Sequence, residues 1–565
     1  MRRNTLIEAD RLSFSLEIKH DGYDRLGTSL NEGALRHGEA PSYSSAPILA
    51  LLFQYAVVGL INGGIASIKY PILTGYFQLE GNVLNSGSAL MTLGWSLKVF
   101  FGLLTDCVPI FGLRRKPYIF LGWVFTGITL VILAVRQPGA PFPNALATVN
   151  GSILALLCAV ACFFFILADV AQDAMVVEYA QCEPEIIRGR LQALVYGTRA
   201  LSMAIISMVA GLCLNSRRMA GSFDWDITIN GFFALLATPV LINIGIVWFF
   251  IQDSKILATP LCQYLTKLWN LAQKRVVWQI MIFQFMFALF TSSIGTTAAP
   301  YVSLFWAKVE TLNLAIMHVI GYLIFAGVVF AIGHIGTNWN WRIVLVLTTL
   351  IANAIDAIVQ FLTIFNIVRN QWFYLGVPLT EELPKAINFV IGTFVIVELA
   401  EEGNEGVMYG LLTTVGNLPS VFGTLLTNLV DAQLMYSKET IRQDTQESRI
   451  AVAWSYLILY ATTIVGCFWV ILLPSQKCGI SKLKENGGQY PQLAWLIFFT
   501  FFVVFTASIT GTMTSMFEST SCLALAGGHG CNTNPPKWYL LGIFLPPAIL
   551  LIVSLLKFVV KLSMP

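Results

Sequence analysis

Long apolar runs recur along almost the whole chain and are separated by short polar stretches. A helix needs about 20 apolar residues to cross a hydrocarbon core about 30 Å thick. Fourteen runs approach or exceed this length, and the tenth is short. The pattern therefore predicts an all-α polytopic membrane protein with helices at 47–68, 84–104, 118–135, 151–179, 191–214, 228–251, 277–303, 312–335, 342–365, 386–400, 406–430, 450–473, 491–515 and 538–560.

Two similar helix starts indicate an internal duplication. Residues 185–199 and 401–417 each place a glycine at the start of a helix, then a glycine-containing turn and a polar residue. The two stretches lie six predicted helices apart, which is typical of two six-helix bundles joined by a linker. We expect a tail (1–46), a first bundle (47–251), a linker (252–276), a second bundle (277–473) and two additional transmembrane helices (474–565).

Composition supports a membrane location and narrows the function. Hydrophobic residue types make up 56% of the chain and charged types only 12%, whereas soluble domains carry roughly 25% charged residues. The formal net charge of +3 gives no reason to expect a nucleic-acid partner. Phosphate-binding loops and metal-ligand spacings are not evident in the sequence, so we expect neither an enzyme nor a cofactor or metal.

Loop charges and two sequence marks orient the helices. The short basic loop at 114–116 is predicted to be cytoplasmic, because inside loops carry more Lys and Arg. Both termini are then cytoplasmic, and the plasma membrane is the expected location. In this orientation the glycosylation sequon at Asn150 lies outside. Cys522 and Cys531 share the last outside loop, where a disulfide is plausible.

Three stretches carry a family resemblance. Residues 98–118 contain a lysine, then Gly-Leu-Leu-Thr-Asp, Val-Pro-Ile-Phe-Gly and Arg-Arg-Lys-Pro-Tyr. This region resembles the folate–biopterin transporter family, a branch of the major facilitator superfamily, and residues 168–178 and 398–413 resemble two further motifs of that family. The loop at 376–384 and the two additional helices depart from the family pattern.

The resemblance implies a 6+6 major facilitator core. It also implies a secondary transporter of folate, biopterin or a similar pterin that works by alternating access. S-adenosylmethionine is an alternative substrate that the same resemblance allows. A receptor or scaffold that does not transport is an alternative of another class.

The basic loop also carries a candidate gate. Asp106 ends the second predicted helix, and the basic residues that open the third are Arg114, Arg115 and Lys116. Opposite charges at this position could pair across the two bundles and hold one state closed. The alternative is that the basic residues only set the topology.

Four charged residues in the first bundle form a candidate network. An ionisable group inside a membrane helix is costly and usually faces a partner or a watery cavity. Asp169 and Asp173 are four residues apart, hence on one helix face. Lys98 and Arg199 lie at a similar depth, roughly 12–14 Å from the cytoplasmic edge. The network is interpreted either as structural ion pairing or as a proton site, with protons as the coupling ion.

Candidate substrate-binding residues lie in both bundles. Lys69 and Asn62 share a face of the first helix, where a cation suits an anionic substrate, unless Lys69 extends to the lipid headgroups. Asp356 or Glu398 could accept the adjacent N–H groups of a pterin ring. Gln284 is one of several polar residues in the seventh helix.

Overall fold

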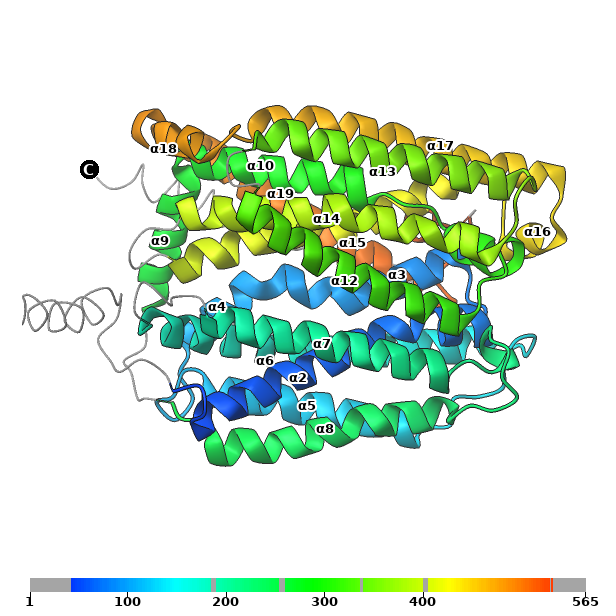
Figure 1. The fold of residues 1–565 in the computed structure, drawn as a ribbon, viewed down its shortest axis with the longest axis horizontal. Coiled ribbons are helices and arrows are strands. Elements are labelled where there is room, and N and C mark those ends of the chain that lie inside the picture. The colour runs from blue at the N-terminus through cyan, green and yellow to red at the C-terminus, as the bar shows by residue number, and fades with distance from the viewer. Residues whose placement is uncertain are drawn as a thin grey trace, which may run out of the picture.

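The computed structural model describes residues 42–183, 190–253, 260–335, 339–399, 405–528 and 530–531. Long helices run side by side along the longest axis of the molecule (Figure 1). We call the end that bears α9 (Leu261–Gln273) the linker end, and the end that bears α16 (Lys438–Gln443) the far end.

The helices from α2 to α8 form a first bundle, in the lower half of Figure 1. Its second crossing is bent, because the short turn η2 (Leu93–Leu97) separates α3 from α4. The helices of this bundle are α2 (Ala46–Ser67), with its π-helical continuation η1 (Lys69–Tyr76), α3 (Gly81–Thr92), α4 (Lys98–Cys107), α5 (Lys116–Val135), α6 (Ala147–Gln181), α7 (Arg190–Cys213) and α8 (Thr228–Phe250).

The helices from α10 to α17 form a second bundle, in the upper half of Figure 1. They are α10 (Arg275–Ala288), with η4 (Leu289–Ser293), the short α11 (Ala299–Tyr301) with η5 (Val302–Trp306), α12 (Thr311–Ile335), α13 (Trp341–Ile364), α14 (Gln371–Leu399), α15 (Glu405–Asp431) and α17 (Gln446–Phe468), with η6 (Trp469–Leu472).

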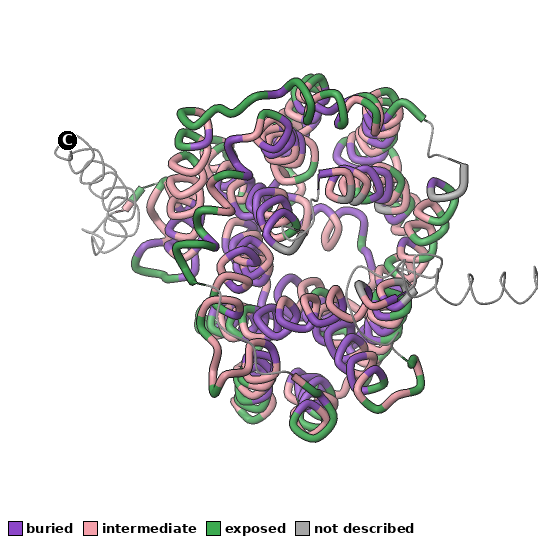
Figure 2. The backbone as a smooth tube through the Cα atoms, turned by 90° about the vertical axis from the view of Figure 1, so that its left-hand side faces the viewer, coloured by how far each residue is buried: buried purple, intermediate pink, exposed green. Residues whose placement is uncertain are grey.

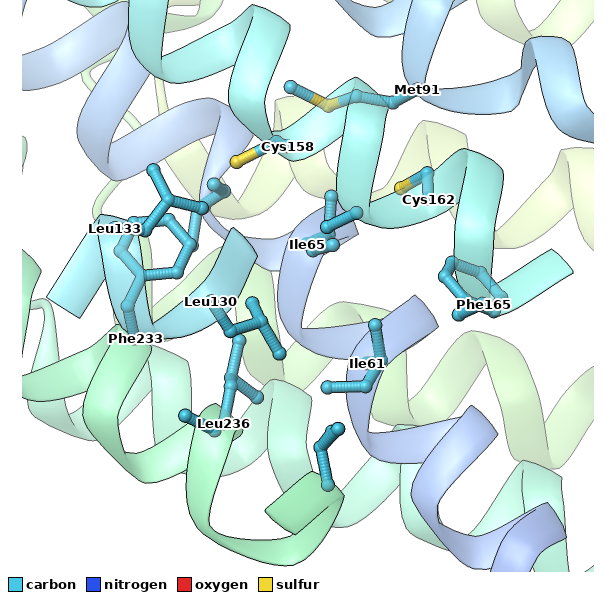
Figure 3. Close-up of a cluster of buried hydrophobic side chains, with 14 of the residues drawn as sticks. Ile61, Ile65, Met91, Leu130, Leu133, Cys158, Cys162, Phe165, Phe233 and Leu236 are labelled. Carbon is cyan, nitrogen blue, oxygen red and sulfur yellow. The ribbon is translucent and has the colours of Figure 1, made fainter. Parts of the chain in front are cut away.

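Burial follows the pattern expected of helices in a lipid environment. Buried residues gather on the sides of helices that face other helices, and exposed residues gather on the perimeter (Figure 2). Ile61, Phe165 and Phe233 belong to the large apolar core of the first bundle (Figure 3). Large apolar side chains such as Leu241 and Ile343 are exposed, as they would be towards lipid.

Eleven helices in the described ranges are long and apolar enough to cross a membrane. The predicted all-α polytopic class is thus confirmed. The more polar helices α14 and α15 are also long and pack within the second bundle. The predicted helix at 538–560 and most of the predicted tail at 1–46 lie outside the described residues.

Two predicted segments were wrong in extent. The tenth was expected at 386–400, whereas α14 begins at Gln371 and includes the stretch interpreted as a loop. The seventh was expected to be continuous over 277–303, whereas the helical backbone breaks after Ser293. A helix can break at membrane depth where the freed backbone groups find partners, and the amide of Gly295 donates to Thr427 Oγ1 at 2.9 Å.

One more apolar helix, α19 (Pro491–Ser515), follows the second bundle and the short amphipathic α18 (Lys477–Asn486). It packs against both α3 and α15, one helix from each bundle. The amide of Asn82 in α3 donates to the carbonyl oxygen of Ala526 at 3.0 Å. The segment after the second bundle is therefore attached along the seam between the bundles.

Candidate transport site

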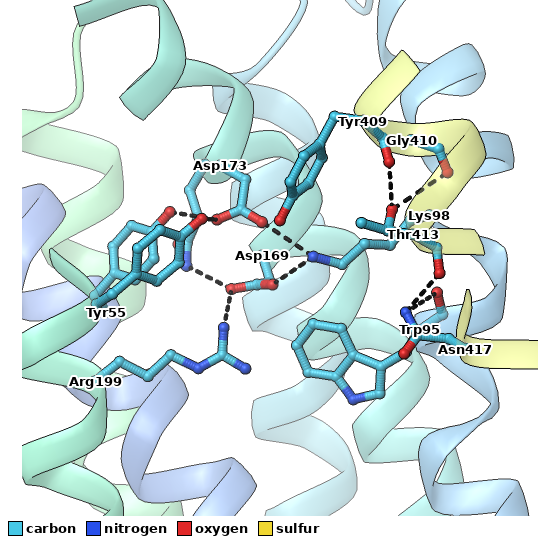
Figure 4. A network of polar contacts seen from close by, with 12 residues as sticks. Tyr55, Trp95, Lys98, Asp169, Asp173, Arg199, Tyr409, Gly410, Thr413 and Asn417 are labelled. Carbon is cyan, nitrogen blue, oxygen red and sulfur yellow. Dashed lines mark hydrogen bonds and ion pairs between the residues drawn. The ribbon is translucent and has the colours of Figure 1, made fainter. Parts of the chain in front are cut away.

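Four charged side chains of the first bundle meet in what we call the charge cluster: Lys98, Asp169, Asp173 and Arg199 (Figure 4). The ammonium of Lys98 lies 3.1 Å from Asp173 and 3.6 Å from Asp169. The guanidinium of Arg199 lies 3.6 Å from Asp169. The structure thus brings together all four residues of the network expected from the sequence, and their formal charges cancel.

Local sequence places each member of the cluster. Asp169 and Asp173 are one turn apart on α6, and Lys98 is the first residue of α4. Arg199 lies where α7 packs closely on α2, because Gly59 has no side chain. A Cβ at Gly59 would lie 2.3 Å from the carbonyl oxygen of Arg199. The approach of α2 therefore depends on glycine.

Neutral side chains also contact the cluster. The hydroxyl of Tyr55 donates to Asp173 at 2.5 Å, and the amide of Gln172 donates to Asp169 at 3.3 Å. The ring of Trp95 faces both cations, at 4.7 Å from Lys98 Nζ and 5.0 Å from the Arg199 guanidinium carbon. Asp169 has no exposed area at all. Such a set costs little to bury, because each charge has an opposite charge and a hydrogen bond or an aromatic face.

The second bundle contacts the first beside this cluster. The bend before α4 frees the amide of Val99, which donates to Thr414 Oγ1 of α15 at 2.9 Å. The Tyr409 ring of α15 lies 6.0 Å from Lys98 Nζ. A change of charge in the cluster would therefore alter the contacts between the two bundles.

The candidate gate differs from the expectation. Arg115 pairs with Asp106 at 2.9 Å, and Arg114 pairs with Glu178 at 3.3 Å, so the described pairs of this loop lie within the first bundle rather than across the two. The reason is the tight turn at 110–113, which folds the basic residues back onto α4. Lys116 contributes its backbone amide, which donates to Asp253 at 3.0 Å.

A cavity of about 500 Å³ lies between the bundles on the far-end side of the charge cluster. Ligand sites are commonly concave, with a few placed polar groups, and occupy 300–1,000 Å³. Both bundles line it, and most of the lining residues have polar side chains. The lining residues are Lys69, Asn85, Ser88, Ala89, Thr92, Ser292, Ser293, Gly295, Thr296, Ala299, Asp356, Gln360, Tyr374, Glu381, Ser420, Thr424, Thr427, Tyr456 and Leu459.

Two of the five predicted substrate-binding residues, Lys69 and Asp356, line this cavity from opposite bundles. The other three are not among its lining residues. Asn62 contacts the Met203 sulfur at 3.8 Å, and Gln284 lies within α10. Glu398 is the penultimate residue of α14, which ends at Leu399, so it lies at the linker end and away from the cavity.

Several lining residues were not predicted. Gln360 follows Asp356 by one helical turn and donates to it at 3.2 Å, so helical spacing could have found it. Tyr460 of α17 is not a lining residue, but it donates to the other oxygen of Asp356 at 2.9 Å. Glu381 was missed because residues 376–384 contain two prolines and two adjacent acids, a composition typical of loops.

The structure agrees with one of the two features predicted for the outer side, the disulfide, and not with the other, the glycosylation site. Cys522 and Cys531 are joined by a disulfide, as the sequence predicted. Asn150 lies in the first turns of α6 rather than in a loop, and its side chain accepts a hydrogen bond from Arg136 at 3.2 Å. The geometry therefore gives no support to glycosylation of Asn150.

The bundles are hydrogen-bonded to each other across the far end. Lys438 of α16 donates to the carbonyl oxygen of Gln78 at 2.9 Å and lies 3.7 Å from Glu80. Thr311 Oγ1 donates to the carbonyl oxygen of Met219 at 2.8 Å, and Tyr301 donates to that of Leu79. These contacts join the two bundles at the far end.

Two bundles around a polar cavity define a membrane transporter with a major-facilitator-like fold. A D-xylose–proton symporter has this fold, with a TM-score of 0.56 and 14% identity over 77% of this chain and 99% of that one. A peptide transporter of the POT type gives a TM-score of 0.55 and 11% identity over 81% and 99%.

The chain belongs to the BT1 family, the folate–biopterin transporters, whose pattern matches residues 59–492. This confirms the resemblance seen in the sequence and places the protein among transporters rather than enzymes. Folate transporter 1 of Plasmodium falciparum is 23% identical over 446 residues, which cover 75% of this chain and 79% of that protein. The folate-biopterin transporter of Synechocystis is 27% identical over 208 residues, and the match covers only 37% of either chain.

Proposed function

We propose that the protein is a secondary active transporter that moves folate, biopterin or a similar pterin by alternating access, coupled to protons. The observation that carries this proposal is the cavity between the bundles, with Lys69 on one wall and Asp356 on the other. The names of the relatives point to the same substrates.

The chemistry of the two walls suits a pterin with an acidic tail. A pterin ring presents adjacent N–H donors, which a carboxylate such as Asp356 accepts in a charge-assisted pair. Folate also carries carboxylates, which the ammonium of Lys69 would attract. S-adenosylmethionine has a carboxylate and cationic groups and therefore remains the second candidate substrate.

The charge cluster is the proposed coupling site. Asp173 is its most accessible carboxylate, with 13% of its side chain exposed, whereas Asp169 is fully buried. Protonation of Asp173 would weaken its pair with Lys98, which contacts the ring of Tyr409 across the seam. The proton would thereby change the contact between the bundles that must rearrange during transport.

The proposed orientation places one end of the molecule in the cytoplasm and the other outside. The linker end is proposed to face the cytoplasm, because it carries the basic turn at 114–116 and the linker helix α9. The far end, with the disulfide, then faces outward and is closed by the hydrogen bonds of Lys438 and Thr311. We propose that this conformation of the protein is the inward-open state of the transport cycle. The change to an outward-open state would break these contacts.

The direct test is uptake of labelled folate and biopterin into liposomes that carry the purified protein, with and without an inward proton gradient. We expect uptake above that of empty liposomes and a clear increase with the gradient. The variant Asp173→Asn keeps the fully buried Asp169, which pairs with both cations, and should transport without responding to the gradient. Absence of uptake of any pterin would refute the substrate assignment, whereas uptake that ignores the gradient in the wild type would refute only the coupling.

A further inference from the structure

The early start of α14 places charged residues inside a membrane helix of the second bundle. Glu381 lies ten residues after Gln371, so roughly 15 Å from the far end of the helix. Asp356 lies eight residues before Ile364 in α13, so roughly 12 Å from the same end. Because α13 and α14 pack against each other, the two carboxylates stand at similar depth in one wall of the cavity.

Glu381 belongs to a triad on one face of α14. The ammonium of Lys385 lies 3.1 Å from Glu381 Oε2 and 3.3 Å from Glu382 Oε1. Two carboxylates share one cation, so the triad carries a formal charge of −1. Glu382 points towards α12, where its side chain lies 3.4 Å from the position a Cβ would take on Gly321. Of the three, Glu381 alone lines the cavity.

Glu381 has room for a ligand. Its side chain is 46% exposed at membrane depth, and it opens onto the cavity rather than into packed protein. The ion pair with Lys385 uses Oε2, which leaves Oε1 for another donor. A carboxylate at this depth is costly, so it is expected to face a functional partner or water.

The two walls of the cavity therefore differ in charge. The second bundle contributes Glu381 and Asp356, whereas the first contributes Lys69. Within the described residues, Lys69 forms no ion pair with a carboxylate. A ligand with an anionic group at one end and N–H donors at the other could pair with Lys69 on one wall and with the two carboxylates on the other.

We propose that Glu381 is a substrate-binding residue that, with Asp356, accepts the N–H donor edge of the ligand while Lys69 binds its carboxylate. This inference rests on the proposed function. Lys385 is a positioning residue, because it holds Glu381 against α14 and neutralises Glu382. The substrate then contacts both bundles. Its binding in the cavity therefore depends on how the two bundles are placed relative to each other.

The test is equilibrium binding of labelled biopterin and folate to the full-length protein in lipid nanodiscs. Glu381→Gln keeps the shape and removes the charge, and it should weaken binding of both ligands by about 10- to 100-fold, because the hydrogen bonds to the ligand lose their charged acceptor. Glu382→Gln is the matched control, because it changes the same triad but does not line the cavity. It should change affinity by less than about threefold.

A second readout separates binding from folding. Lumazine carries an oxo group where pterin has its 2-amino group, so the wild type should prefer pterin over lumazine. Glu381→Gln should lose this preference, and Glu381→Asp should keep it. Equal affinity of Glu381→Gln and wild type, or an unchanged preference, would overturn this inference. Failure of the wild type to bind any pterin would instead overturn the proposed function.

Discussion

The charge cluster and the cavity both hold ionisable groups at membrane depth, but they use them differently. In the cluster each charge faces an opposite charge of the same bundle, and Tyr55, Gln172 and Trp95 occupy the remaining directions. In the cavity the cation and the carboxylates stand on opposite walls and lack each other as partners. The cluster is therefore balanced by its own charges, whereas the cavity leaves Lys69 without an ion pair among the described residues.

The largest expected effect comes from unbalancing the cluster. Asp169→Asn would leave two buried cations, Lys98 and Arg199, with a single carboxylate. Removing one partner of a buried pair costs about 3–5 kcal/mol of folding free energy. We expect poor accumulation in the membrane and a clearly lower melting temperature in detergent. If Asp169→Asn melted at the same temperature as the wild type, the cluster would not stabilise the bundle.

The second largest effect is expected from the Tyr55 hydroxyl, which donates a hydrogen bond to Asp173. Tyr55→Phe removes a donor at 2.5 Å from this carboxylate without changing the size of the ring. Hydrogen bonds to charged groups contribute about 1.5–3 kcal/mol, so thermal unfolding should shift less than for Asp169→Asn. Tyr43→Phe removes a hydroxyl bonded to Glu183 outside the cluster and is the matched control. It should shift the unfolding temperature less, because Tyr43 is only partly buried whereas Tyr55 is fully buried. Equal shifts in the two variants would argue against a special role for the cluster.

A change in the cavity should alter binding rather than stability. Lys69→Gln should weaken folate binding about tenfold, or roughly 1.4 kcal/mol, because a carboxylate loses its cation. Biopterin, which has no carboxylate, should bind almost as before. The melting temperature without ligand should not fall, because Lys69 forms no described ion pair. Equal losses for folate and biopterin would contradict the assignment of Lys69 to the anionic end.

The smallest effect is expected from an ion pair outside both regions. Arg218 hydrogen-bonds Asp226 at 2.6 Å in the loop before α8 and lowers the pKa of this carboxyl to about 2. The folded pKa lies below the ordinary value of about 3.9. The stabilisation is therefore present above pH 4 and is lost as the pH falls towards 2. Asp226→Asn should cost less than about 1 kcal/mol and leave the pH dependence of uptake between pH 5 and 8 unchanged. An altered pH profile for uptake would place the coupling site elsewhere.

The sequence predicted those parts of the fold and site that depend on spacing within one helix. Apolar run length located most of the crossings, and the four-residue spacing of Asp169 and Asp173 together with depth counting identified the charge cluster. Its neutral partners, Tyr55 and Trp95, depend on how helices are rotated against each other, which a one-dimensional pattern does not contain.

The failures arose where tertiary contacts replace local preferences. Residues 376–384 look like a loop, yet they are helical within α14, because prolines are tolerated in membrane helices packed against neighbours. This error concealed Glu381. The direction of the basic side chains at 114–115 depended on a tight turn that the sequence did not reveal.

The charges in the cavity are placed to bind a ligand, whereas the charges of the cluster pair with one another. The most direct test is the shift in melting temperature that saturating folate causes in the wild type and in Asp356→Asn. Asp356→Asn loses charge-assisted hydrogen bonds from Tyr460 and Gln360, so each protein is compared with its own melting temperature without folate. We expect folate to raise the melting temperature of the wild type by several degrees and that of Asp356→Asn by much less, because a ligand stabilises the state it binds. An equal rise in both proteins would contradict the claim.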